Sequence, residues 1–382
     1  MTTFAIAGAG FSGAVLARQL AEAGHRCTVF DSRPHVAGNC YTERDDETQV
    51  MVHTYGPHIF HTANERVWEY INRFGDLVPY DHHVKTTVGD EIFALPINLL
   101  TINQLFGTDF DTQQAEEFVD GLGDHSISDP QNFEEQALRF VGRRMYEAFF
   151  YGYTRKQWGV EPAELPASIL ERLPVRFDTN QSYFNHPHQA IPRHGYTPIV
   201  EAILNHPGIT VHLSTPLTQA RRVGFDHTIW TGPLDAYFEH GHGRLGYRTL
   251  DFEASRSHGD AQGIAVMNYG DFDVPYTRVS EHKHFAPWES HERTITFKEY
   301  SRYCEPDDTP YYPIRLNDDH ALLDTYLDAA EQVANVTFAG RLGTYRYLDM
   351  DVTIAEALDT ADAMLACIDA NQVIPSFFID PR

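Results

Sequence analysis

The sequence predicts an α/β fold made of a Rossmann-like unit, an inserted helical region and an antiparallel sheet on the substrate side. Three observations lead to this prediction. A short apolar run at 3–7 leads into a glycine-rich turn at 8–13. A strand-like segment at 336–339 precedes a helical pattern close to the end of the chain. Between these ends, from about 244 to 300, apolar and polar residues alternate as in antiparallel strands.

The glycine-rich turn is the clearest local signal. Gly8 allows a tight turn, Gly10 lets the backbone approach a pyrophosphate, and Gly13 lets the following helix pack closely on the strand. The helix is expected to stop near Gly24, and a second strand at 27–30 ends in Asp31, whose carboxylate can accept hydrogen bonds from a ribose diol. This order of elements predicts dinucleotide binding.

The same glycine pattern occurs again at 241–246, after a helix-like stretch and before a strand-like one. A phosphate-binding turn needs the opposite order, with the strand first and the helix second. We therefore interpret the second match as chance.

The residues after Asp31 favour FAD over NAD. The chain does not return to a helix there but forms an extended loop, typical of FAD enzymes related to amine oxidases and glutathione reductase, with Ala37 where that pattern usually has glycine. The loop contains Ser32, Arg33, Gly38 and Asn39. At the other end of the chain, a helix expected near Ile354 would point its N-terminus at the flavin. An ordinary helix–strand connection is the alternative for that late segment.

Composition excludes several classes of protein. The chain has 29 Lys+Arg and 54 Asp+Glu, a net charge of −25 that argues against nucleic acid and anionic membrane surfaces as partners. No apolar run reaches the roughly 18 residues that span a bilayer, and 4–17 lacks the basic leader of a signal peptide. The 4 cysteines form no C-x-x-C pair and no histidine pair has a convincing partner, so we expect no metal. A soluble cytoplasmic protein is expected.

The length of 382 residues suggests two or three domains, two being the better guess. Helical periodicity at 64–74 and 133–149 predicts inserted helices between the two FAD segments. The predicted parts are a discontinuous FAD-binding domain at 1–60, 190–240 and 330–382, a mainly helical insertion at 61–185, and an antiparallel sheet region over the flavin at 241–329.

The stretch 150–180 differs from the acidic remainder of the chain, because its basic and acidic residues balance and aromatic residues are frequent. Aromatic faces beside arginine forks suit a nucleoside diphosphate, whereas a core helix pair with solvated charges is the alternative. Glycine and prolines within about 159–177 break regular helix and predict a mobile lid, against the alternative of a fixed hairpin.

Eight motifs then occur in one order along nearly the whole chain. They lie at 56–61, 152–159, 164–167, 172–177, 275–278, 281–285, 310–313 and 340–350. With these motifs the chain resembles the bacterial UDP-galactopyranose mutase family. The resemblance implies an isomerase, an intramolecular transferase that interconverts UDP-galactopyranose and UDP-galactofuranose with no net redox change. It also implies FAD that is active when reduced, attack of flavin N5 on the anomeric carbon, a flavin–sugar adduct, and a homodimer or higher homo-oligomer.

The resemblance also assigns residues. It implies that Arg172, on the lid, and Arg278 hold the diphosphate. His61 is a candidate for proton transfer or flavin positioning, with a packed core histidine as the alternative. The substrate residues it implies are His82, Phe150, Tyr151, Thr154, Trp158, Tyr183, Asn268, Tyr312 and Tyr347. The flavin residues are Gly8, Gly10, Phe11, Ser12, Gly13, Asp31, Ser32, Arg33, Gly38, Asn39, His58, Ile59, Arg341, Asp349, Met350 and Asp351.

Two departures from the family pattern put the local pocket geometry in doubt. Pro57 replaces a residue that is usually alanine, and His82 stands where enteric relatives have asparagine. Two other functions stay open at this point: a flavin oxidoreductase of the amine-oxidase-like class, and a flavin-binding protein without enzymatic activity. Consumption of an electron acceptor would favour the first, and absence of turnover with reduced flavin the second.

Overall fold

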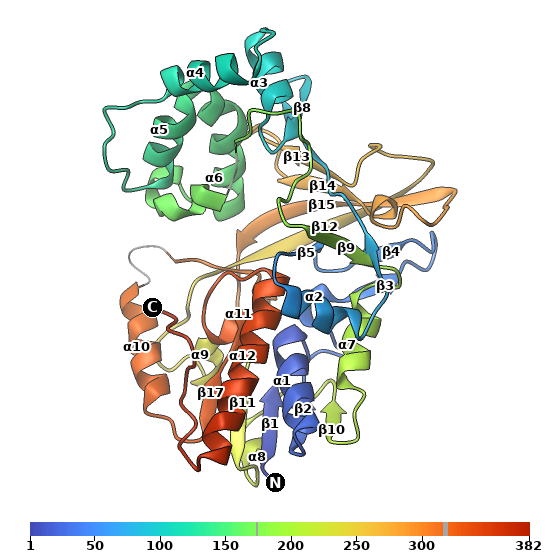
Figure 1. Cartoon of the computed structure of the whole chain (residues 1–382), viewed down its shortest axis with the longest axis vertical. Coiled ribbons are helices and arrows are strands. Elements are labelled where there is room, and N and C mark those ends of the chain that lie inside the picture. Colours follow the sequence, from blue (N-terminus) through green and yellow to red (C-terminus); the bar gives the residue numbers. More distant parts are fainter. Residues whose placement is uncertain (173–174, 316–319) are drawn as a thin grey trace.

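A computed structural model describes residues 1–172, 175–315 and 320–382 of the chain. Figure 1 shows a parallel sheet with its helices at one end of the molecule and a helical lobe at the other. A large, strongly twisted sheet lies between the two. The candidate site lies where the parallel sheet meets the large sheet, so we describe these parts first.

The N-terminal unit has the predicted strand, turn, helix and strand. β1 (Thr3–Ala7) leads into α1 (Phe11–Glu22), and β2 (Arg26–Phe30) follows. The glycines are needed where they stand: Gly8 has a φ of +101°, and a Cβ on Gly13 would lie 2.0 Å from the carbonyl oxygen of Gly8. The prediction from the glycine spacing is therefore confirmed for this unit.

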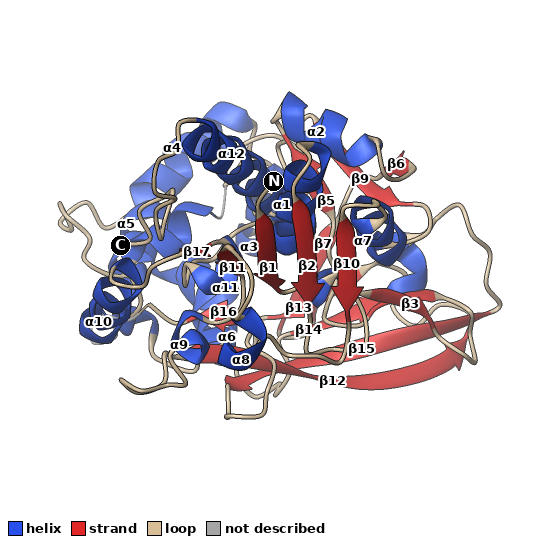
Figure 2. Cartoon of the chain, turned by 90° about the horizontal axis from the view of Figure 1, so that it is seen from below, coloured by secondary structure: helices blue, strands red, loops and turns tan. Residues whose placement is uncertain are grey.

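Strands from separate parts of the chain complete the parallel sheet. Its order is β10 (Ile209–His212), β2, β1, β11 (His227–Trp230) and β17 (Val336–Phe338), and every neighbouring pair is parallel. Figure 2 shows α1, α7 (Tyr196–Leu204) and α12 (Met350–Asp369) on one side of this sheet, where their apolar faces form a buried core. α9 (Leu234–Tyr237) and α10 (His320–Glu331) pack with β17 in a second core cluster, and α8 (Gln219–Arg222) is short.

The large sheet has seven strands and is mixed. Its order is β16 (Tyr312–Pro313), β12 (Tyr247–His258), β15 (Arg293–Tyr303), β14 (Arg278–Glu281), β13 (Val266–Tyr269), β7 (Val84–Val88) and β8 (Glu91–Leu95). The alternation from about 244 to 300 correctly predicted antiparallel strands, which are β12, β13, β14 and β15. The parallel pairing of β13 with β7 was not predicted, because β7 comes from the stretch expected to be mainly helical.

The helical lobe contains α3 (Leu99–Phe106), α4 (Thr112–Leu122), α5 (Phe133–Met145), a π-helical turn η2 (Tyr146–Tyr151) and α6 (Gly152–Trp158). Side chains of Asn98, Asp111 and Asn132 cap the first three helices. The single helix predicted over 133–149 is interrupted at Gly142, whose φ is 71°. A Cβ there would lie 2.3 Å from the carbonyl oxygen of Leu122, so this break lets α5 pass close to the end of α4.

Shorter elements connect these parts. β5 (Phe60–Thr62), β9 (His188–Pro192) and β6 (Leu77–Pro79) form a small antiparallel sheet, beside which lies α2 (Glu65–Asn72), close to the helix predicted at 64–74. β3 (Thr42–Arg44) pairs with β4 (Met51–His53). The remaining turns are η1 (Gly38–Cys40), η3 (Pro162–Glu164), η4 (Ala167–Arg172), η5 (His282–Phe285) and α11 (Gly340–Gly343). In the described residues, no helix combines the length and the apolar character needed to cross a membrane.

Candidate active site

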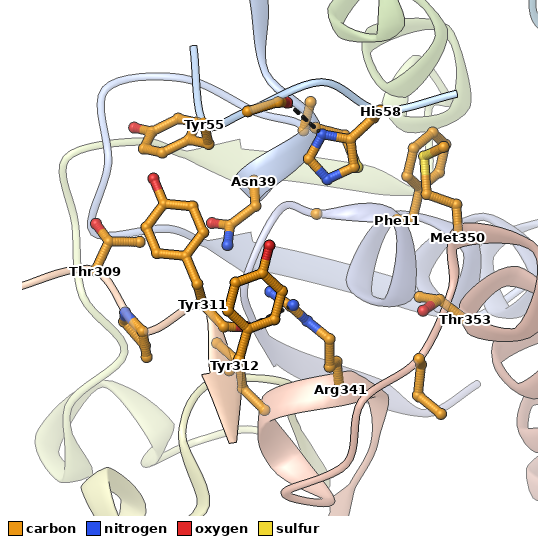
Figure 3. A pocket seen from close by; sticks show the side chains of 18 of the residues that line it. Phe11, Asn39, Tyr55, His58, Thr309, Tyr311, Tyr312, Arg341, Met350 and Thr353 are labelled. Atoms are coloured by element: carbon orange, nitrogen blue, oxygen red, sulfur yellow. Dashed lines mark hydrogen bonds between the residues drawn. The ribbon is translucent and has the colours of Figure 1, made fainter. Parts of the chain in front are cut away.

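A cavity of about 780 Å³ extends from the carboxyl ends of the parallel strands to the face of the large sheet. Its lining comes from the glycine turn, the loop 55–61, strands β12 to β16, and the start of α12. Figure 3 shows Tyr55, His58, Tyr312 and Arg341 around this space, contributed by distant parts of the chain. The cavity therefore depends on the fold as a whole.

The glycine turn forms one end of the cavity. Gly8, Gly10 and Ser12 line it, and α1 begins at this turn with its N-terminus toward the cavity. Asp31 is buried at the end of β2, where its carboxylate accepts hydrogen bonds from the backbone N–H of Ala9 at 2.8 Å and of Arg33 at 2.9 Å. The turn thus offers backbone donors and a helix terminus, the elements that hold a pyrophosphate.

The predicted loop after β2 supplies hydrogen-bond donors that lack a partner. Nη2 of Arg33 donates to Oδ1 of Asn39 at 2.9 Å, and the guanidinium lies 4.6 Å from the centre of the Tyr55 ring. Nη1 of Arg33 and Nδ2 of Asn39 are buried without a protein partner among the described residues. Buried donors are normally satisfied, so an acceptor-rich ligand is expected here. This donor set fits the phosphate and ribose oxygens of FAD.

The start of α12 forms another wall. Asp349 is the N-cap residue of this helix, and Asp349, Met350 and Thr353 line the cavity. Nη1 of Arg341 donates to the carbonyl oxygen of Tyr311 at 2.6 Å, which joins this end of the chain to the segment before β16. The N-terminus of a helix favours negative charge, as the late helix of an FAD site would require.

The loop 55–61 crosses the cavity between these walls. Nδ1 of His58 lies 2.8 Å from the carbonyl oxygen of Gly56 (Figure 3), and its backbone N–H donates to Nδ1 of His53. Burial lowers the pKa of His58 to about 4, so its ring is neutral at neutral pH. Pro57, Ile59 and His61 also line the cavity.

Arg278 provides the positive charge at the other end of the cavity. Its Nη2 donates to the hydroxyl of Tyr153 at 2.6 Å, and its Nε lies 3.5 Å from Oε1 of Glu299, which is 2% exposed. Burial alone would lower the pKa of Arg278, but Glu299, Tyr153 and Tyr312 raise it by more than burial lowers it. The guanidinium therefore stays charged. Burial raises the pKa of Glu299, and Arg278 opposes that shift.

Further predicted substrate residues gather around this arginine. His82, Tyr183, Asn268, Tyr312 and Tyr347 all line the cavity. Burial lowers the pKa of His82 to about 3. Nδ1 of His82 and Oδ1 of Asn268 are buried polar atoms to which no described residue offers a partner. This end of the cavity therefore combines a fixed charge, neutral polar atoms and aromatic rings.

Other predicted residues lie outside the cavity lining. Phe150 belongs to the core of the helical lobe, Thr154 is a buried residue of α6, and Tyr151 contacts Arg155 and Glu161. Trp158 lies behind the wall, with its ring 6.4 Å from that of Tyr312. Gly13 packs against Gly8, and Asp351 lines a separate outer groove.

The predicted lid is described only in part. Arg172 ends η4, and its side chain lies outside the described structure. Residues 173–174, within the predicted lid, also lie outside the described residues. The lid and the role of Arg172 therefore stay predictions.

Several residues of the cavity were not predicted. Tyr55, Glu299, Thr309 and Tyr311 line the cavity, and Tyr153 contacts Arg278 from outside the lining. Tyr153 and Tyr311 stand inside recognised motifs, so closer attention to those motifs could have found them. Glu299 has no such signal, because it reaches Arg278 only through the pairing of β14 with β15.

The fold and the cavity define a Rossmann-like dinucleotide-binding protein with a second, arginine-containing compartment. A model of NAD(P)-binding Rossmann-like domains matches residues 6–74, and a model of UDP-galactopyranose mutase matches residues 148–347. The chain belongs to the UDP-galactopyranose mutase family. It is thus an isomerase of the flavin-dependent group that interconverts pyranose and furanose forms of nucleotide sugars, for which FAD is the expected cofactor.

Similar proteins support this membership. A relative named "Probable UDP-galactopyranose mutase" from Klebsiella pneumoniae is 55% identical over 99% of this chain and 98% of its own. A dTDP-fucopyranose mutase from Escherichia coli is 48% identical over 94% of this chain and 98% of its own. A crystal structure of reduced UDP-galactopyranose mutase has a TM-score of 0.72 at 15% identity, covering 96% of each chain, and supports the fold.

Proposed function

We propose that this protein interconverts UDP-galactopyranose and UDP-galactofuranose with reduced FAD and no net redox change. The observation that carries the proposal is one cavity with a dinucleotide-binding turn at one end and the Arg278, Tyr153 and Glu299 cluster at the other. Of the two relatives described above, the one with 55% identity bears a UDP-galactopyranose mutase name. Both support a nucleotide sugar that lies against the flavin.

The residues that would hold FAD are those that offer hydrogen-bond donors or a helix N-terminus to its oxygen atoms and negative charge. The backbone donors of the glycine turn would bind the pyrophosphate, and the unpartnered donors of Arg33 and Asn39 would be satisfied by FAD oxygens. The N-terminus of α12 lies where negative charge is stabilised. When bound and reduced, FAD supplies a nucleophilic ring nitrogen to the anomeric carbon of the sugar.

Arg278 would act on the leaving diphosphate. As the bond between sugar and diphosphate breaks, negative charge builds up on the phosphate oxygens. The guanidinium is held by Tyr153 and Glu299 before substrate arrives, so it need not reorganise to meet that charge. Stabilisation that is stronger in the transition state than in the bound substrate increases the rate. Arg172 would add a second guanidinium when the lid reaches the cavity.

The alternative candidate substrate is the nucleotide sugar dTDP-fucopyranose, because a dTDP-fucopyranose mutase is 48% identical to this chain. The test is an HPLC assay of purified protein with UDP-galactofuranose and with dTDP-fucofuranose, each with and without dithionite. We expect turnover only after reduction and a higher kcat/KM for UDP-galactofuranose. A preference for the thymidine sugar would replace the proposed substrate, and consumption of an electron acceptor on turnover would favour an oxidoreductase.

A further inference from the structure

Two histidines connect the cofactor cavity with a groove on the outer surface. Nδ1 of His61 lies 2.8 Å from Nδ1 of His186. His61 lines the cavity, whereas His186 lines the outer groove. The groove is also lined by Ala63, Asn64, Asp349, Asp351, Val352 and Ala355. The two rings therefore form a hydrogen-bonded link between the interior and the surface.

Neighbouring residues hold both rings in place. His61 lies in β5, and the ring of Phe184 stacks on it with centres 3.7 Å apart. In β9, Gln189 is the register partner of His61, and its Nε2 donates to the carbonyl oxygens of Phe184 and His186. The contact between the imidazoles is thus fixed from both strands.

A hydrogen bond between two imidazole nitrogens contains one proton, donated by one ring and accepted by the other. In the described parts of the chain, Nε2 of neither ring has a hydrogen-bond partner, which leaves both outer nitrogens available. Burial lowers the pKa of His61 and His186 lowers it further, while Asp349 and Asp351 at the start of α12 oppose the shift. His82, buried beside the same cavity, also interacts electrostatically with His61.

We propose that His61 and His186 carry a proton between the outer groove and the cofactor cavity. The inference rests on the flavin part of the proposed function and not on the identity of the sugar. A flavin that accepts two electrons also accepts a proton, and a reductant that gives electrons alone, such as dithionite, does not supply it. The buried cavity therefore needs a path for that proton.

The inward transfer balances at each atom. Water in the groove protonates Nε2 of His186, and the proton on Nδ1 of His186 moves to Nδ1 of His61. His61 then releases its Nε2 proton into the cavity. Each ring forms one N–H bond and loses one, the electron pairs stay on the nitrogens, and one proton has moved inward. Outward transfer restores the starting tautomers, as suits a reaction without net proton change.

The first test asks whether the shared proton exists. In protein labelled with 15N-histidine, NMR should reveal a 15N–15N coupling across the hydrogen bond between His61 and His186. The coupling should disappear in His186→Ala and persist in His188→Ala. His188 is the matched control because its ring stacks on Trp68 and contacts Glu65, away from the cavity. Absence of the coupling in the unaltered protein would overturn the proposal.

The second test separates proton transfer from a structural role. The reduction of bound FAD by dithionite is followed by absorbance in H2O and D2O. We expect His186→Ala to slow reduction about tenfold or more, as for loss of a proton-transfer group, and His188→Ala to leave the rate unchanged. Added imidazole should restore the His186→Ala rate, whereas pyrazole, of the same shape but far less basic, should not.

Equal rescue by imidazole and pyrazole would assign His186 a space-filling role and overturn the proposal, as would an unchanged rate in His186→Ala. The outcomes remain distinguishable from a failure of the proposed function. A protein without UDP-galactofuranose turnover can still show isotope-sensitive, His186-dependent reduction of its FAD. If the purified protein binds no FAD, both the proposed function and the proton path are wrong.

Discussion

Arg278 keeps its positive charge in a buried position because its partners surround it. Tyr153 and Glu299 fix the guanidinium, and neither lies near Arg278 in the sequence. If the Glu299 carboxylate formed a close ion pair with the guanidinium, it would neutralise the positive charge and weaken the binding of an anion there. The 3.5 Å separation of Nε and Oε1, without a hydrogen bond, leaves the guanidinium able to bind a diphosphate.

Removal of this charge should impair turnover and not folding. We expect Arg278→Ala to lower kcat/KM of the reduced enzyme by on the order of 10² to 10³, the size seen when a charge-stabilising donor is lost. Arg172→Ala should have a similar effect. The control is Arg382→Ala, which removes an exposed arginine that contacts α10. Flavin absorbance should be unchanged in all three, and a near-normal rate in either site variant would contradict its role.

Buried histidines make the folded protein sensitive to mild acid. Burial lowers the pKa of His82 and His282 to about 3 and of His227 to about 4, against 6.5 for the free side chain. Below pH 6.5 the unfolded chain therefore binds more protons than the folded one, and stability falls as the pH falls. This loss of stability extends over the pH range from 6.5 down to about 4.

We expect the free energy of unfolding to fall by about 1.4 kcal/mol per pH unit for each of these histidines over that window. Urea unfolding at pH 7.0, 6.0 and 5.0 measures the change. The carboxylates Asp45 and Glu289 have lowered pKa values, so the stability that they contribute is lost only at lower pH. A constant urea midpoint from pH 7 to 5 would contradict the neutral, buried state of the histidines.

At the scale of elements, α6 connects the helical lobe to the large sheet. Its Tyr153 contacts Arg278, and the carbonyl oxygen of Gln157 accepts a hydrogen bond from Oγ of Ser301. Nζ of Lys156 lies 2.7 to 3.1 Å from the carbonyl oxygens of Tyr269, Asp271, Val274 and Tyr276, which share its three N–H donors. One short helix thus fixes the hairpin that leads into Arg278.

Lys156→Met should leave these carbonyl oxygens without their donor. We expect a loss of about 2 to 4 kcal/mol in the free energy of unfolding, because hydrogen bonds to a charged group are lost at a half-buried place. Lys85→Met is the control, since Lys85 is an exposed lysine of β7 and should change stability by about 0.5 kcal/mol or less. Equal urea midpoints for the two variants would show that Lys156 does not hold the hairpin.

The segment after α6 carries the lid prediction. Gly159 ends the helix in a left-handed conformation with a φ of 73°, and the described residues up to Arg172 form only the short 3-10 turns η3 and η4. We expect hydrogen exchange in peptides covering 159–177 to slow when saturating UDP is added, since Arg172 must approach the diphosphate. Peptides from α12 provide the internal control. Equal exchange with and without UDP would contradict a lid.

At the scale of the whole molecule, local and long-range features differed in how well the sequence predicted them. β1, α1 and β2 follow from glycine spacing and apolar runs within 30 residues. The meeting of β7 with β13 depends on backbone pairing between segments far apart, and nothing local in β7 indicates its partner. Glu299 was not predicted for the same reason, because it lies beside Arg278 only through the register of β14 and β15.

The assembly of the parallel sheet has a consequence for synthesis of the protein on the ribosome. β1 and β2 emerge first, but β17 and α12 belong to the last 50 residues or so of the 382. Until these leave the exit tunnel, one edge of the sheet and one wall of the cavity are missing, and the nascent chain cannot complete the proposed FAD site. Long-range pairing of this kind slows folding and leaves apolar surface exposed meanwhile. Early termination before residue 336 should therefore yield a colourless, chaperone-bound product and not a weakly active flavoprotein.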